Sequence, residues 1–214
     1  MYVKGQVLPI RRGGGINQSL LRDFASFVSR GEWCHIFPEG GVWQLREGLG
    51  GRDQRVVNGN VSAFGGEQTS YNIFSEKHQA RGKLKWGVGK LIAHAPKRPR
   101  VVIFAHAGME SLLPQDVDTM KTYLNIDLFG GRDRLNVFIR FGKEINFDDL
   151  IEEHEVKHGK LWEYGDNTEP KKEQWYSSNA EKILYHKIVF RIEAELERLT
   201  KDVVTTHAQK YNSV

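Results

Sequence analysis

The pattern of apolar residues along the chain changes between helical and strand-like spacing in an order typical of α/β proteins. Apolar residues recur at helical spacing from Leu20 to Val28, and they predict a helix. A bulky apolar run from Trp33 to Phe37 follows at once and predicts a buried strand. A shorter apolar stretch at residues 7–10 precedes the helix. Strand, helix and strand in this order favour a right-handed crossover.

The same alternation continues after a long interruption. Residues 83–93 are predicted to form a helix with glycines where another element packs closely, and a strand is predicted at residues 100–105. A further strand is expected at residues 135–141, turned by Gly142 and Lys143. A charged helix is expected from Asp148 or Asp149 to about Lys157.

A long helix is predicted to close the chain, over about residues 178–205. Ser178 and Glu181 have the spacing of a capping box at its start. Its apolar stripe consists of Ile183, Leu184, Ile188, Ile192, Leu196, Leu199 and Val203. The polar face mixes acidic and basic residues, whereas a helix lying on a membrane surface is chiefly basic. We therefore expect this helix to pack on the domain or on a partner.

The length of 214 residues and the 39% hydrophobic content predict a single domain with a real core. A glycine-rich stretch at about residues 41–82 has no sustained period and is interpreted as an insertion. No apolar run is long enough to span a bilayer as a helix, and residues 1–15 lack the features of a secretory signal. The single cysteine, Cys34, forms no intrachain disulfide and is expected to fill space in the core.

The charge of the chain is unevenly distributed. The formal net charge is only +4, but the segment from Lys77 to Met109 contains eight lysines and arginines and no acidic residue. Such a stretch favours an anionic partner such as phosphate headgroups, a membrane surface or nucleic acid. A solvated lysine-rich face is the alternative interpretation of the same pattern.

Two short segments have the composition of a phosphate-binding site. Pro38 ends the predicted strand at Phe37, and Glu39 and Gly40 follow where the strand leaves the sheet. Upstream, two arginines including Arg12 precede three glycines, which combines fixed positive charge with accessible backbone amides. We expect the exit after Phe37 and the exit near His106 to form a crevice at one edge of the sheet.

Several stretches in order resemble the glycerolipid acyltransferases, and particularly the tafazzin-like branch of that family. The Phe-Pro-Glu-Gly turn at residues 37–40 is the element common to the whole family. The Lys-Trp-Gly-Val-Gly stretch at residues 85–89 and the His-x-Gly-Met stretch at residues 106–109 are more particular to the tafazzin-like branch. The resemblance is good over residues 5–41 and 83–114, and faint after residue 143. It implies an α/β fold with an acyltransferase-like sheet flanked by helices.

The resemblance implies acyl transfer between phospholipids and lysophospholipids, as in cardiolipin remodelling, without a cofactor. It implies substrate binding by residues at the two phosphate-binding segments, namely Arg12, Gly13, Phe37, Pro38, Glu39 and Gly40. Glu39 would accept a hydrogen bond from a glycerol hydroxyl or orient Arg12. The basic stretch would face an anionic membrane surface. A peripheral membrane location is implied, and the resemblance alone points to mitochondria.

The chain departs from the family at its catalytic element. That element is a histidine separated by four residues from an aspartate, upstream of the glycerophosphate-binding stretch, and none of the eight histidines here has an aspartate at that spacing. We therefore expect an N-terminally incomplete acyltransferase fold that carries the binding half. Three explanations are open. The sequence is a truncated gene model, the protein is a noncatalytic phospholipid-binding relative, or another histidine acts as the base, for which His106 is the candidate.

Two further functions are weighed against this one. His154, Glu155 and His158 match the His-Glu-x-x-His zinc pattern, which predicts a metallopeptidase if Glu169, Glu173 or Glu181 supplies a third ligand. The charged Lys157 within the motif argues against it, and our interpretation has no metal site. Nucleic acid would also bind the basic stretch, but no recognisable nucleic-acid module accompanies that stretch, so no nucleic-acid partner is expected.

Overall fold

A computed structural model describes residues 8, 14–38, 84–114, 123–124, 136–161 and 175–211. These residues divide into two compact units. The first unit comprises residues 14–38, 84–101, 144–161 and 175–192, and the second comprises residues 102–143 and 193–211 where they are described. The predicted insertion at residues 41–82 lies outside the described residues.

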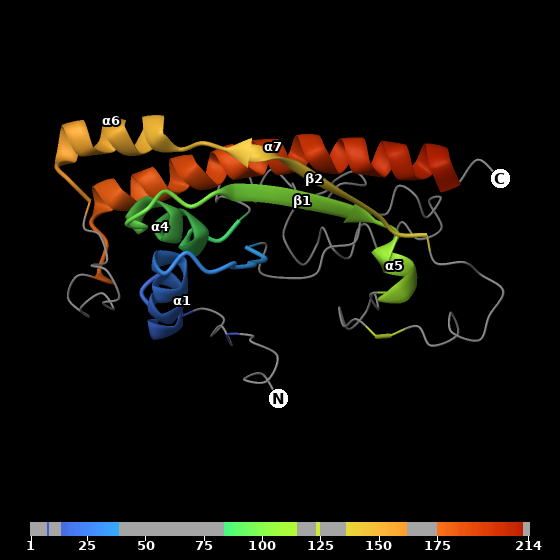
Figure 1. Ribbon diagram of the computed structural model, residues 1–214, viewed down its shortest axis with the longest axis horizontal. Coiled ribbons are helices and arrows are strands. Elements are labelled where there is room, and N and C mark those ends of the chain that lie inside the picture. The colour runs from blue at the N-terminus through green and yellow to red at the C-terminus, as the bar shows by residue number, and fades with distance from the viewer. Residues whose placement is uncertain are drawn as a thin grey trace, which may run out of the picture. The chain divides into compact units, whose positions relative to one another are not determined.

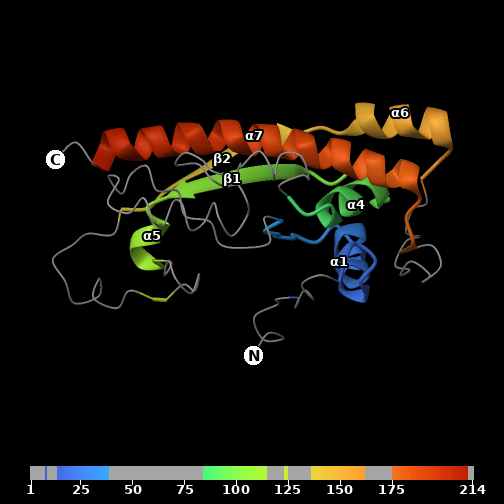
Figure 2. The ribbon, with the colours of Figure 1, turned by 180° about the vertical axis from the view of Figure 1, so that it is seen from behind.

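The first unit is a cluster of helices. The predicted first helix is confirmed as α1 (Ser19–Ser29), and the helix predicted at residues 83–93 is confirmed as α4 (Gly87–His94). Helix α1 packs against α4 (Figures 1 and 2). Leu21 and Ala25 of α1 form one apolar cluster with Leu91 of α4 and with Trp175.

The segment after α1 corrects the prediction of a buried strand at residues 33–37. These residues form no strand, and Trp33 and Phe37 are 94% and 65% exposed. Ile36 packs against the cluster around Leu21, and Cys34 is only half-buried. The reason is that the sheet of the described residues contains two strands from elsewhere in the chain, and neither of them pairs with this segment. The predicted crossover through this segment is therefore wrong.

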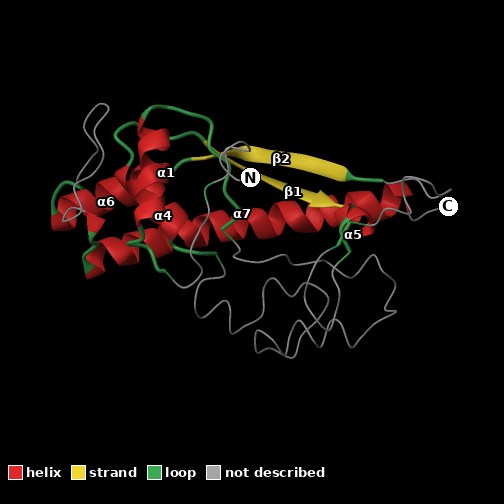
Figure 3. Ribbon diagram, turned by 90° about the horizontal axis from the view of Figure 1, so that it is seen from below, coloured by secondary structure: helices red, strands yellow, loops and turns green. Residues whose placement is uncertain are grey.

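The second unit contains most of a two-stranded antiparallel sheet, made of β1 (Val101–Ala107) and β2 (Phe138–Ile145). Figure 3 shows the two strands side by side, with the short helix α5 (Met109–Leu112) following β1. One face of the sheet is covered by the C-terminal part of the long helix α7 (Asn179–Tyr211). The core of this unit consists of Ala105, Ala107, Leu199 and Val203.

Both strands begin and end later in the sequence than predicted. β1 continues through His106 to Ala107, so His106 lies within the strand and not after it. β2 includes Gly142, which was expected to turn the chain. A Cβ atom at Gly142 would lie 2.9 Å from Cγ1 of Ile103, so glycine allows β2 to approach the Ile103 side chain closely.

The two predicted C-terminal helices are confirmed. The charged helix is α6 (Asp148–His158), and the closing helix is α7, which continues past the predicted end to Tyr211. The capping box is present: the Ser178 amide donates to Oε2 of Glu181 at 2.5 Å, and the Glu181 amide donates to Oγ of Ser178 at 3.2 Å. Most of the predicted stripe is at least partly buried, but Ile183 is exposed.

Helices together with a small sheet are consistent with the predicted α/β class. Among the described residues, no helix is both long and apolar enough to cross a bilayer.

Candidate functional site

The predicted substrate-binding turn is described only at its entrance. Phe37 and Pro38 belong to the first unit, whereas Glu39 and Gly40 lie outside the described residues. The carbonyl of Pro38 accepts a hydrogen bond of 2.8 Å from the amide of Lys85. The chain that enters the turn is therefore fixed to the segment that leads into α4.

The loop before α1 is also fixed to α4. Arg12 and Gly13, the upstream candidates, lie outside the described residues, but Asn17 follows them closely and its Oδ1 accepts a hydrogen bond of 3.2 Å from Nζ of Lys90. The side chain of Gln18 donates to the carbonyl of Gly15 at 2.8 Å and holds the loop just before the helix. Helix α4 and the residues that lead into it thus contact a described flank of each predicted binding segment.

Lys90 makes this connection from a buried position. Its side chain is fully buried, with Nζ 3.9 Å from the centre of the Trp175 ring and a hydrogen bond to the Trp175 carbonyl. Burial lowers the pKa of Lys90 to about 8, and the charge of Glu181 acts in the opposite direction. The structure therefore corrects one part of the predicted basic surface, because Lys90 does not reach solvent.

A second buried polar contact joins α4 to α7 one turn further along. Nε2 of His94 lies 2.6 Å from the hydroxyl of Tyr185, and the hydroxyl donates to Oγ of Ser177 at 3.0 Å. Oε1 of Glu181 lies 3.4 Å from Nε2 of His94. Burial raises the pKa of Tyr185, so the phenol stays protonated and continues to donate.

The two helices meet closely because of one glycine. A Cβ atom at Gly89 would lie 2.6 Å from the carbonyl oxygen of Tyr185. The glycines of this helix predicted such close packing, but the cluster of His94, Glu181 and Tyr185 was not predicted. The available signal was the spacing, since Lys90 and His94 are four residues apart in one helix and Glu181 and Tyr185 are four apart in another.

The other described cations of the basic stretch differ in their partners. Nε of Arg98 lies 3.3 Å from Asp148, and Nε of Arg100 lies 2.9 Å from Glu144. Lys85 and Lys97 are exposed, and no ion pair is found for either of them within the described parts of the chain. Lys77, Arg81 and Lys83 lie outside those parts. An anionic partner would therefore meet two exposed lysines, Lys85 and Lys97, and two arginines that already form ion pairs, Arg98 and Arg100.

The candidate histidine belongs to the second unit. His106 is exposed on β1, beside the ring of Phe104. Gly108, directly after the strand, has a φ of 91°, and a Cβ atom there would lie 1.9 Å from the carbonyl oxygen of Asn136. Nε2 of His207 lies 2.9 Å from the same oxygen. His207 was missed because the closing helix was predicted to end before it.

The zinc-like motif lies on α6. The rings of His154 and His158 are 4.9 Å apart, beside a shallow hollow of about 250 Å³ between α6 and α7. Burial and the neighbouring His158 lower the pKa of His154. Within the described ranges, no group of three or more potential ligands comes together. Glu181, one proposed third ligand, contacts His94, and Glu169 and Glu173 lie outside the described ranges.

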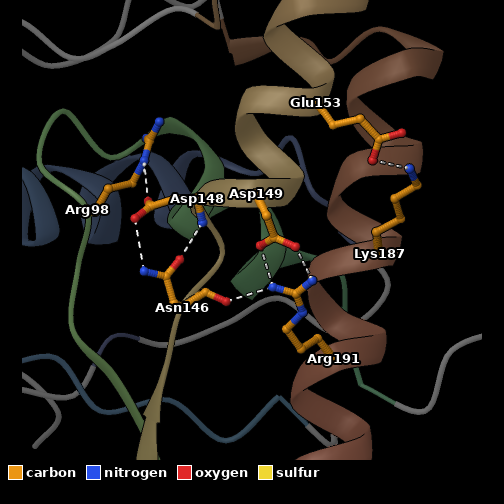
Figure 4. Close-up of polar contacts among 7 residues, drawn as sticks. All are labelled: Arg98, Asn146, Asp148, Asp149, Glu153, Lys187 and Arg191. Atoms are coloured by element: carbon orange, nitrogen blue, oxygen red, sulfur yellow. Dashed lines mark hydrogen bonds and ion pairs between the residues drawn. The ribbon is translucent and has the colours of Figure 1, made fainter.

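An ionic clamp holds α6 on α7 within the first unit (Figure 4). We define it as Asp149 and Glu153 of α6 with Arg191 and Lys187 of α7. The guanidinium of Arg191 donates to both carboxylate oxygens of Asp149, at 2.6 and 2.7 Å, and Nζ of Lys187 donates to Glu153 at 3.1 Å. The Arg191 bond holds the pKa of Asp149 at about 2.

Comparison with known proteins was made on the whole chain. No protein-family model matches it, and no solved structure matches it. An Arabidopsis thaliana protein named N-acylphosphatidylethanolamine synthase is 30% identical over 116 residues, which is 54% of this chain. Drosophila melanogaster Tafazzin is 25% identical over 150 residues, or 70% of this chain. The predicted resemblance to tafazzin-like acyltransferases is confirmed.

A third relative extends the similarity. Dictyostelium discoideum Taffazin is 27% identical over 180 residues, which is 81% of this chain. The matched regions are only 30%, 28% and 48% of the three relatives themselves. The chain therefore spans less than half the length of each of these relatives.

Proposed function

We propose that this chain takes part in acyl transfer from a phospholipid to a lysophospholipid and carries the part that binds the glycerophosphate portion of the lipid. The observation that carries this proposal is the similarity to two proteins named for tafazzin, over 70% and 81% of this chain. The third relative is named for the synthesis of an acylated phospholipid, which supports lipid acyl transfer as the reaction class. That the substrate is of the cardiolipin type is part of this proposal, and the names of the relatives do not state it.

The geometry of α4 supports a binding role for the two segments beside it. Lys90 holds the loop that follows Arg12 and Gly13, and the amide of Lys85 holds the chain that enters Glu39 and Gly40. A guanidinium and free glycine amides suit a lipid phosphate. The carboxylate of Glu39 is then available to accept a hydrogen bond from the glycerol hydroxyl or to orient Arg12. We further propose that the protein works at a membrane surface, and that this membrane is mitochondrial.

A second candidate function is phospholipid binding without catalysis. It is favoured by one observation: no histidine of this sequence has an aspartate five positions later, which is the spacing of the family's catalytic pair. If acyl transfer does occur with these residues alone, His106 is the first histidine to test, because it is exposed at the end of β1.

The deciding experiment measures transfer of a labelled acyl chain from phosphatidylcholine to monolysocardiolipin by the purified chain, without coenzyme A. The test variant is Glu39→Gln, which keeps the size of the side chain and removes its charge. The matched control is Glu152→Gln on α6, an exposed glutamate in a confirmed helix. Acyl transfer by the parent chain and by the control, with loss in Glu39→Gln, is the result expected for an enzyme.

Other results lead elsewhere. Binding of monolysocardiolipin without turnover, weakened by Glu39→Gln, identifies the noncatalytic lipid-binding protein. Equal turnover in Glu39→Gln and Glu152→Gln would remove Glu39 from the site. Neither binding nor turnover by the folded chain would contradict both candidate functions.

A further inference from the structure

The segment between α1 and the substrate-binding turn has two unlike faces. Exposure alternates from one residue to the next over residues 33–37, as in an extended chain whose successive side chains point to opposite sides. Cys34 and Ile36 are half-buried, and Ile36 packs against the core. Trp33, His35 and Phe37, on the alternate positions, are exposed. We call these three side chains the aromatic face.

The aromatic face is unusual in composition as well as in exposure. Trp33 has the highest exposure of the large apolar side chains in the described residues, and Phe37 adds a second exposed ring. The rings of His35 and Phe37 lie 4.4 Å apart, so these two side chains form one continuous part of the face. An exposed group of large aromatic side chains marks a site of association. Tryptophan in particular prefers the boundary between hydrocarbon and water.

Positive charge lies at the end of this face. Lys85 is exposed, and its amide bonds to the carbonyl of Pro38, the residue after Phe37. In the sequence Lys85 follows Arg81 and Lys83 in a stretch without any acidic residue. Cations next to aromatic side chains attract an anionic lipid surface, because the charges meet the headgroups while the rings enter below them.

We propose that the aromatic face is the surface by which this protein docks on an anionic phospholipid bilayer, with the ring of Trp33 inserted at the headgroup level. This inference rests on the proposed function, since Phe37 and Pro38 lead directly into Glu39 and Gly40. Docking through this face brings Pro38, the residue that precedes Glu39 in the chain, to the surface where a lysophospholipid presents its glycerol and phosphate. No bilayer-spanning helix is found in the described residues, and docking of this kind requires none.

The test measures binding of the full chain to vesicles of phosphatidylcholine with phosphatidylglycerol, with vesicles of phosphatidylcholine alone in parallel. The test variant is Trp33→Glu. The matched control is Val156→Glu, which places the same charge at another exposed apolar position, on α6, where Val156 is 87% exposed. We expect Trp33→Glu to weaken vesicle binding by about tenfold or more, because an inserted tryptophan is lost and a repelled charge is gained. Val156→Glu should bind like the parent chain, and both variants should keep its circular dichroism spectrum.

Fluorescence gives a second, independent measurement. Lipids brominated near the headgroup quench an inserted tryptophan, so Trp33→Phe should lose the quenchable part of the emission while retaining vesicle binding. Equal vesicle binding by Trp33→Glu and the parent chain would overturn the proposal. So would a dimer of the parent chain that is abolished by Trp33→Glu, since a second copy of the chain would then cover the face.

The docking proposal and the proposed function fail separately. Vesicle binding that depends on Trp33, in a chain with neither turnover nor lysophospholipid binding, would support docking and contradict the function. Turnover of a short-chain, water-soluble lysophospholipid, with no vesicle binding by the parent chain, would support the function and contradict docking.

Discussion

Two helices are attached to α7 within the first unit by polar side chains, but in opposite environments. We define the buried seam as Gly89, Lys90 and His94 of α4 with Tyr185 of α7, and compare it with the ionic clamp between α6 and α7. The seam is inside: Lys90, His94 and Tyr185 have essentially no exposed surface. The clamp is at the surface, and its ion pairs are open to water (Figure 4).

The difference shows which attachment matters for the candidate site. A buried polar group that loses its partner keeps its desolvation cost, whereas an exposed ion pair is screened and contributes little. The seam also connects to a flank of one proposed binding segment, through Lys90 and Asn17, and Lys85, just before α4, bonds to Pro38 at the flank of the other. The clamp has no such connection among the described contacts. We therefore expect changes in the seam to alter both stability and lipid binding, and changes in the clamp to alter neither strongly.

The largest expected effect is that of Gly89→Ala. The new Cβ atom would lie 2.6 Å from the carbonyl oxygen of Tyr185, and backbone on both sides of the contact resists movement. We expect the free energy of unfolding to fall by about 2 kcal/mol or more, measured by urea denaturation. Gly87→Ala in the same helix is the control, because its Cβ atom would meet only the end of the Leu21 side chain, at 3.0 Å. A similar loss in the two variants would contradict the close approach at Gly89.

Tyr185→Phe tests the hydrogen bonds of the seam without changing its packing. The substitution removes the hydroxyl that contacts His94 and Ser177 and leaves both groups short of a partner. We expect a loss of about 1–2 kcal/mol in the free energy of unfolding. Tyr176→Phe, at an exposed tyrosine nearby, should change stability very little. Equal effects of the two substitutions would show that the buried hydroxyl contributes nothing beyond its surroundings.

Lys90 makes stability depend on pH in alkaline solution. Its pKa is about 8 in the folded protein against 10.5 as a model value, so between these values the unfolded chain binds a proton that the folded chain has released. Below pH 8 the buried charge of Lys90 destabilises the fold by its full amount, and this destabilisation disappears as the pH rises toward 10.5. The free energy of unfolding therefore rises with pH between these two values. Lys90→Met should remove this rise, whereas Lys97→Met at an exposed lysine should keep it. Chemical denaturation across this pH range measures the difference, and an unchanged rise in Lys90→Met would exclude Lys90 as its cause.

The smallest expected effect belongs to the ionic clamp. Because Arg191 lowers the pKa of Asp149 from 3.8 to about 2, the pair stabilises the fold above pH 4 and loses this contribution as the pH falls toward 2. Arg191→Gln should make the free energy of unfolding depend less steeply on pH in this range. Added salt should reduce the difference between Arg191→Gln and the parent chain. Arg198→Gln, at an ion pair within α7 itself, is the control. A loss of neutral-pH stability in Arg191→Gln as large as that in Tyr185→Phe would contradict the comparison between seam and clamp.

The helices of this protein could be predicted from sequence because their signals are local. The spacing of Leu20 to Val28, the acidic start at Asp148 and the capping box at Ser178 each depend on residues within a few positions of one another. The resemblance to tafazzin-like acyltransferases likewise came from contiguous segments, and the comparisons confirm it. The roles of Arg12, Gly13, Glu39 and Gly40 stay predictions, because these residues lie outside the described parts of the chain.

The strand prediction at residues 33–37 failed for a physical reason. An apolar run with bulky side chains suits a strand, but a strand needs a neighbour to pair with, and no local pattern provides one. The two strands β1 and β2 pair with each other, and the 33–37 segment forms no strand and exposes Trp33 and Phe37. The predictions of a strand and of burial were therefore both wrong at these residues.

By itself, the sequence determined which segments are helical, most of the apolar stripe of α7 and which family the chain resembles, since all of these depend on residues close together along the chain. Only the tertiary structure decided that Lys90 is buried with a pKa of about 8, that His94 meets Tyr185 and that Trp33 faces solvent. Burial, the pairing of distant polar groups and the close approach at Gly89 depend on which helices pack together, and helix packing is set by surfaces that come from residues far apart in the chain.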